Sequence, residues 1–213
     1  MQDQSFIANI FIPNKGFDWR LTSSRLLYGS SGILVIFGIV VGQLDLNYDQ
    51  NEQVKIVFFA LMILALIGAR WGAKEKERIF GLIEGQLEIT TSYLSIKDKR
   101  YYWDSISNFS FNVLQVKGEP LHALKGIYKY YGGPAFSGGV NNYIKFTSSG
   151  KTVNIKFELS SYSHKFEFEK LFKALFVIGH IELTKTYNGL HLEYEEIQEI
   201  KKERAEYLTS KSL

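Results

Sequence analysis

The sequence predicts a membrane-anchored α+β protein, in which a two-helix transmembrane hairpin is followed by an antiparallel β-barrel or sandwich that is capped by a helix. Three observations predict this class. Two nearly continuous apolar blocks lie before residue 75, the residues after them alternate between apolar and polar, and an amphipathic helical pattern follows the alternation. The 213 residues leave room for about one ordinary domain and a small accessory region.

The overall composition excludes some classes of site. A net charge of +3 is too small to indicate nucleic-acid binding without local clustering of cations, so we expect no nucleic-acid partner. There is no cysteine, which excludes disulfide bonds, thiolate metal sites and a cysteine nucleophile.

Residues 1–25 form an N-terminal segment that is apolar but interrupted. Phe6 and Phe11 make it too apolar for a solvated tail, whereas Pro13 and Gly16 break any long element. We expect this segment to lie along the cytoplasmic membrane interface or against the soluble domain.

The two apolar blocks, residues 26–44 and 56–73, have the length of membrane spans. Each approaches the roughly 20 residues that cross a ~30 Å hydrocarbon core, where only a helix satisfies its own backbone groups. Buried core helices would carry a polar face, and a signal peptide would start nearer the N-terminus. The first span contains small residues for close packing against the second span or in a dimer, namely Gly29, Ser30, Ser31, Gly32, Gly38 and Gly42.

Charges around the two blocks predict their orientation. By the positive-inside rule both termini are cytoplasmic, and we expect a multi-pass protein of the cell (cytoplasmic) membrane. Arg70 lies inside the second block, where its stem can snorkel to the interface beside Trp71; a functional intramembrane charge is the alternative. The flanking basic residues are Lys15, Arg20, Arg25, Arg70, Lys74, Lys76 and Arg78, and the acidic loop residues are Asp45, Asp49 and Glu52.

Residues 79–179 have the pattern of a sheet covered by a helix. Residues 97–100 are typical of a charged turn between two strands, and the alternation over residues 143–159 predicts an antiparallel hairpin. The helix that follows ends at Gly179. Its apolar stripe, which we expect to cover the open side of the sheet, comprises Phe168, Leu171, Phe172, Leu175 and Phe176.

Residues 180–213 form a C-terminal extension that ends in a charged helix. Residues 181–194 allow two interpretations, because Asn188-Gly189 is typical of a hairpin turn but could equally introduce the last helix. Residues 192–208 predict that helix, which packs on the domain or binds a partner.

This order of elements resembles the pleckstrin-homology-like (PH-like) domains of bacterial membrane-anchored proteins, the YcxB-like group. The residues that carry the likeness are 85–96, the Tyr-Trp-Asp-Ser-Ile run at 102–106, the hairpin at 143–159 and the helix at 166–176. The likeness covers roughly residues 80–178. It implies a PH-like cytosolic domain behind a helical hairpin.

The motifs of common active sites do not occur. The histidines at positions 122, 164, 180 and 191 lack metal-ligand spacing, and no serine elbow is present. The glycine-rich residues 131–140 do not fit a phosphate-binding fingerprint, and we interpret them as a loop that could touch a ligand or partner. We therefore expect no enzyme, no metal and no cofactor.

One basic cluster suggests a binding surface. A PH-like domain implies that cations near its first hairpin turn hold anionic headgroups or a partner, at about 1 kcal/mol per cation near an anionic leaflet. A solvated turn, with Asp98 offsetting the cations, is the alternative. We expect a non-enzymatic membrane-tethered module that binds a protein partner or the anionic leaflet surface; the alternatives are a structural subunit of a larger membrane complex and an enzyme with an unrecognised site. The candidate residues are Lys97, Lys99, Arg100, Lys125 and Lys129.

Overall fold

The computed structural model describes residues 4–44, 46–121 and 133–212. The chain divides into two compact units. One comprises residues 1–15, 79–118 and 138–213, and the other comprises residues 16–78 and 119–137. The first unit contains a sheet with three helices, and the second contains two long apolar helices.

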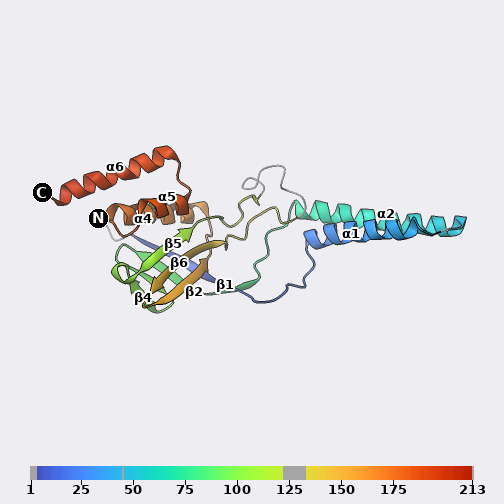
Figure 1. Ribbon diagram of the computed structural model, residues 1–213, viewed down its shortest axis with the longest axis horizontal. Helices are drawn as coiled ribbons and strands as arrows, with labels where there is room; N and C mark the ends of the chain where they lie inside the picture. Colours follow the sequence, from blue (N-terminus) through green and yellow to red (C-terminus); the bar gives the residue numbers. More distant parts are fainter. Residues whose placement is uncertain (1–3, 45, 122–132, 213) are drawn as a thin grey trace. The chain divides into compact units, whose positions relative to one another are not determined.

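The first unit is built on a seven-stranded antiparallel sheet with the strand order β4-β3-β2-β1-β7-β6-β5 (Figure 1). The α+β prediction is confirmed, whereas the predicted barrel or sandwich is replaced by a single open sheet. The described strands form one open sheet, with β4 and β5 at its edges and the 3-10 helix η1 (Trp103–Ser105) between them in sequence. The strands are β1 (Ser5–Pro13), β2 (Gly81–Thr90), β3 (Tyr93–Ile96), β4 (Lys99–Tyr102), β5 (Ser107–Asn112), β6 (Asn142–Ser148) and β7 (Lys151–Phe157).

Strand β1 places part of residues 1–25, which we expected along the membrane interface or against the soluble domain, within the sheet of that domain itself. Residues 5–13 lie between β2 and β7 in the middle of the sheet. Phe6, Ala8 and Ile10 alternate into the core, and each is at most 3% exposed. The sequence pattern missed this strand because its partners are distant: Ser5 pairs with Thr90, and Ile10 pairs with Phe157.

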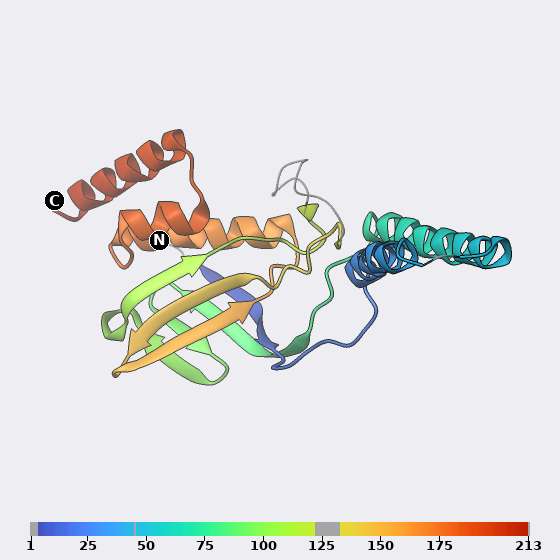
Figure 2. The same ribbon diagram turned by 45° about the vertical axis from the view of Figure 1, so that its right-hand side comes forward.

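Helix α4 (Tyr162–Ile178) covers the core face of the sheet (Figure 2). The Ser161 side chain caps its first turn, and Gly179, at φ 95°, ends it in the left-handed conformation that suits glycine. The predicted aromatic stripe is confirmed as core. Phe168 and Phe172 are fully buried, with ring centroids 4.1 Å apart.

Two helices follow α4: α5 (Leu183–Leu190) and α6 (Tyr194–Lys211). The hairpin interpretation of residues 181–194 is therefore wrong, and these residues lead into the last helix. Gly189 serves close packing instead of a turn, since a Cβ there would lie 2.6 Å from the Phe111 ring. On α6, Ile200 is buried against α4 residues Phe176 and Val177.

The second unit contains α1 (Ser23–Val41) and α2 (Tyr48–Gly72), which run side by side as a hairpin (Figure 1). Both are long and apolar enough to cross a membrane, and only 6% of each apolar window is buried. At 1.5 Å per residue they measure about 28 and 37 Å, against a core of about 30 Å. The helices begin three and eight residues before the predicted spans at 26 and 56.

Close packing of the hairpin uses a different glycine from those expected. Nothing lies within 4 Å of a Cβ placed on Gly29, Gly32 or Gly38. A Cβ on Gly68 of α2 would instead lie 2.7 Å from the backbone nitrogen of Leu27. Gly68 of the second span is therefore a small residue at the helix contact, and Ser30, one of the small residues expected in the first span, is buried.

Polar contacts close the base of this hairpin. The Glu75 carboxylate accepts hydrogen bonds from the backbone nitrogen of Ser23, at 3.2 Å, and from the Ser23 hydroxyl. The backbone carbonyl of Glu75 accepts from the nitrogens of Ala135 and Phe136, at 2.7 and 3.2 Å. This part of the glycine-rich segment thus docks by its backbone onto the residues that follow α2, while residues 131 and 132 lie outside the described residues.

Candidate functional site

The predicted basic turn connects β3 and β4 at the edge of the sheet. Lys97 lies in the turn with φ 54°, and its ammonium contacts the Glu84 carboxylate at 2.7 Å. This hydrogen bond lowers the pKa of the Glu84 carboxyl below its usual value. Lys99 lies over the Tyr101 ring at 5.0 Å, and Arg100 lies over the Tyr93 ring at 4.9 Å.

The cations of this turn are thus occupied by the protein itself. One forms an ion pair and two stack on tyrosine rings, contacts that an anionic headgroup would have to compete with. Lys125 and Lys129, the other two candidates, lie outside the described residues. The described part of the chain therefore brings together three of the five candidate cations.

Each of the described histidines contacts another group of the protein through a hydrogen bond or a stacked ring. His164 Nε2 donates to the Ile7 carbonyl at 2.7 Å, because a carbonyl only accepts. Its Nδ1 then faces the Ser160 hydroxyl at 3.1 Å. His191 contacts the Asn112 side-chain oxygen at 2.7 Å, and His180 stacks on Trp103. No group of three or more His, Cys, Asp or Glu side chains suited to a metal occurs among the described residues.

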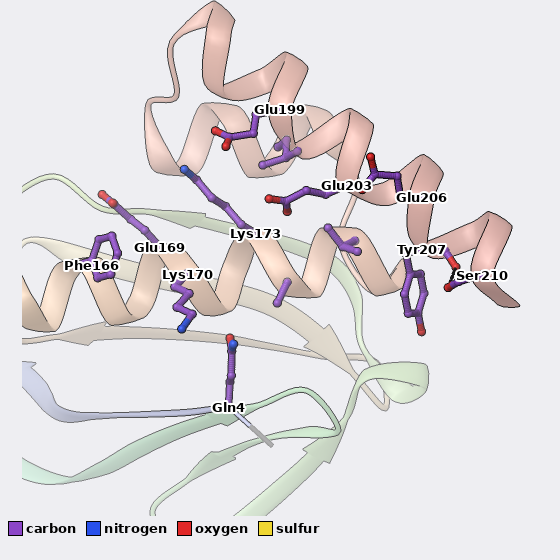
Figure 3. Close-up of a pocket in the computed structure, with 13 residues that line it drawn as sticks. Gln4, Phe166, Glu169, Lys170, Lys173, Glu199, Glu203, Glu206, Tyr207 and Ser210 are labelled. Atoms are coloured by element: carbon purple, nitrogen blue, oxygen red, sulfur yellow. Dashed lines mark hydrogen bonds between the residues drawn. The ribbon is translucent and has the colours of Figure 1, made fainter. Parts of the chain in front are cut away.

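A groove lies between α4 and α6 in the sheet unit (Figure 3). It encloses about 710 Å³. Its apolar residues come from both helices: Phe166, Ala174 and Val177 from α4, and Ile200 and Tyr207 from α6. Phe166 is 66% exposed, so a large aromatic side chain is available at one end.

The charged residues of the groove are unevenly divided between its walls. Glu199 and Glu203 extend from α6 into the space between the helices, with Glu206 on the same wall (Figure 3). The α4 wall contributes Lys170 and Lys173, together with Glu169. Four carboxylates thus oppose two ammonium groups, and the groove is acidic.

Existing ion pairs occupy charges of both signs in the groove: two of its carboxylates already have lysine partners, Glu169 with Lys165 at 3.7 Å and Glu206 with Lys202 at 3.9 Å. Lys173 contacts Glu196 at 2.9 Å, and this hydrogen bond lowers the pKa of the Glu196 carboxyl. The ion pairs of the described residues include neither Glu199 nor Glu203. These two carboxylates, one helical turn apart, are therefore available to a ligand.

The sequence predicts that the last helix packs on the domain or binds a partner, but its pattern does not indicate a groove against α4. The glutamates at positions 199, 203 and 206 recur at helical spacing, which is a readable signal for one acidic face. The α4 wall of the groove could not be predicted from the sequence, because the groove forms only where α6 lies against α4. No protein-family model, curated protein or solved structure matches this chain.

Proposed function

We propose that this protein is a non-enzymatic, membrane-tethered interaction module with a PH-like cytosolic domain, and that the α4–α6 groove binds a basic amphipathic segment of a protein partner. The groove is the observation that carries the proposal. It combines an apolar floor, an exposed aromatic side chain and an excess of carboxylates, the chemistry of helix-in-groove recognition.

The membrane tether is supported by the position of the helical hairpin between two strands that pair with each other. Pro13 at the end of β1 pairs with Gly81 at the start of β2, and the Asn14 nitrogen donates to the Phe80 carbonyl at 3.1 Å. The chain thus leaves and re-enters the sheet at one point. A segment inserted there crosses a bilayer an even number of times, and α1 and α2 provide two crossings.

The exposure of the two helices also supports the tether. Most of their side chains are apolar and solvent-exposed. Soluble proteins rarely leave so large an apolar surface exposed to water. A cleaved signal sequence is disfavoured because cleavage after α1 would remove β1 from the middle of the sheet. By the positive-inside rule, the sheet lies on the cytoplasmic side.

A PH-like identity is supported by the order of elements. Antiparallel strands lead into one helix that packs across the core face of the sheet, which is the arrangement that the sequence resemblance implies. The basic turn carries less weight in this proposal, because its cations already have partners on the protein. Because likeness of fold alone would not assign a ligand, the proposed binding partner is argued from the α4–α6 groove.

The proposal is tested with a designed peptide. The full chain in detergent is titrated with a fluorescent leucine–lysine amphipathic helix, and binding is followed by anisotropy. We expect the Glu199→Gln, Glu203→Gln double variant to weaken binding about tenfold, because two favourable charge contacts are lost. Glu195→Gln, on the same helix but outside the groove, should bind as the wild type does.

Two outcomes would count against the groove. Equal binding by wild type and the double variant would show that these carboxylates do not contact the peptide. Equal binding of a leucine–glutamate peptide of the same pattern would show that the surface takes any amphipathic helix and has no preference for a basic partner.

A further inference from the structure

A second concave surface lies on one side of α2, within the helical unit. It encloses about 520 Å³ and is lined by Ile63, Leu66, Ile67, Arg70, Trp71 and Lys74. These positions recur at three- and four-residue intervals, so they form a single stripe along the helix. The stripe is apolar over Ile63, Leu66 and Ile67 and becomes cationic at Arg70 and Lys74.

The cations of this stripe differ from others around the hairpin. Arg20 pairs with Asp18 at 2.7 Å, Lys55 pairs with Glu52 at 2.7 Å, and Arg78 approaches Glu75 at 3.6 Å. The ion pairs and side-chain hydrogen bonds of the described residues include neither Arg70 nor Lys74. A guanidinium at the end of a membrane span without a carboxylate partner needs an anion or water from outside the protein.

We propose that Arg70 and Lys74 bind the phosphate of an anionic glycerophospholipid, while an acyl chain lies along Ile63, Leu66 and Ile67. This inference rests on the membrane-tether part of the proposed function. Arg70 lies in the last turn of α2 and Lys74 follows the end of the helix at Gly72, and both line the same surface, so both side chains can reach one phosphate group. Trp71 lies beside them, at the depth where amphipathic rings meet headgroups.

A lipid fits this stripe better than a free anion. Inorganic phosphate would use the two cations and leave the apolar half of the surface unoccupied. A glycerophospholipid carries its phosphate next to an acyl chain, which matches the change from cationic to apolar along the stripe. Two cations without acidic partners select a lipid with net negative charge, the kind enriched in the cytoplasmic leaflet.

The test uses the full chain, delipidated in detergent and titrated with phosphatidylglycerol or with phosphatidylcholine of the same acyl chains. Native mass spectrometry counts the bound lipid. We expect Arg70→Gln with Lys74→Gln to weaken phosphatidylglycerol binding about tenfold, because two cationic contacts are lost. Arg70→Lys should retain most of the binding. Lys55→Gln removes a cation that is already paired with Glu52 toward the other end of α2, so this variant should bind phosphatidylglycerol as the wild type does.

Several results would overturn the lipid site. Phosphatidylglycerol binding that is unchanged in the double variant would contradict it, as would equal binding of phosphatidylcholine. Displacement of the lipid by millimolar inorganic phosphate would assign the site to a free anion. Alkaline carbonate extraction distinguishes the two proposals. Extraction of the wild type from membranes would contradict the tether itself. Retention of the wild type, with phosphatidylglycerol binding unchanged in the double variant, would contradict the lipid site alone.

Discussion

At the scale of single residues, Asn142 shows how a buried polar side chain organises the sheet unit. It is fully buried, and its side-chain oxygen accepts from the nitrogens of Leu114 and Gln115 at 2.9 and 3.0 Å. Its amide nitrogen donates to the carbonyls of Gln115 and Gly139, both at 2.9 Å. One side-chain amide thus forms hydrogen bonds with backbone groups at both ends of the segment that connects β5 and β6.

Asn142→Ala should lower the free energy of unfolding by about 3 kcal/mol, because buried backbone donors and acceptors lose their partner. Thermal unfolding of the full chain in detergent measures the effect. Asn154→Ala is the control, since that residue is exposed on β7. Similar melting temperatures for the two variants would contradict the role assigned to Asn142.

Glu158 adds a pH dependence at the same scale. Burial raises the pKa of its carboxyl, but hydrogen bonds from Lys117 at 2.7 Å and Asn9 at 3.2 Å outweigh burial, and the pKa lies below its usual value. A carboxyl whose pKa is depressed by folding stabilises the protein above its unfolded pKa, near 4.3. That stability is lost as pH falls through the folded pKa.

We therefore expect wild-type stability to fall in acid more steeply than that of Glu158→Gln. The difference should be about 1 kcal/mol, discounted because the Lys117 side chain is half exposed. Melting temperatures between about pH 6 and pH 3 measure it. Parallel curves for the two proteins would rule out this carboxyl as a source of acid sensitivity.

At the scale of elements, α4 has two faces with different tasks. Phe172 is fully buried and contacts Phe109, Phe111 and Phe168 on the sheet side. Phe166, on the same helix, is 66% exposed and lines the groove. The helix therefore carries stability on one side and the proposed recognition on the other.

This division predicts opposite effects of two substitutions. Phe172→Ala should cost about 3–5 kcal/mol of stability through the cavity it leaves. Phe166→Ala should change stability by less than about 0.5 kcal/mol, as exposed substitutions do, yet weaken peptide binding in the groove. Unfolding and anisotropy measured on both variants check this; a destabilised Phe166→Ala with unchanged binding would reverse the assignment.

Elements with a local pattern could be predicted from the sequence, whereas those that depend on distant partners could not. The β6–β7 hairpin, the α4 stripe and the charged last helix each show their period within a few residues. Strand β1 shows no such signal, because Phe6 and Ile10 become core residues only through β2 and β7. The groove could not be predicted for the same reason, since Phe166 of α4 and Glu203 of α6 line one groove only after α6 packs through Ile200.

At the scale of the whole molecule, one feature of connectivity links the two units. The helical hairpin is inserted between two paired strands, so β1 contributes to the sheet only if the chain returns to the side from which it left. Gly81 marks this return point, where a Cβ would clash with the Ile12 carbonyl oxygen. The proposed membrane tether is therefore coupled to the sheet by topology, because one membrane crossing without the other would break the β1–β2 pairing.

The topology of the hairpin tests this account most directly. The chain has no native cysteine, so single cysteines can be introduced at Lys15, Gln43 and Ser212 and labelled in intact cells with a membrane-impermeant maleimide. We predict that Gln43→Cys, between α1 and α2, is labelled from outside, whereas Lys15→Cys and Ser212→Cys react only after lysis. Protection of Gln43→Cys in intact cells, or labelling of all three, would contradict a membrane-tethered protein with its sheet on the cytoplasmic side.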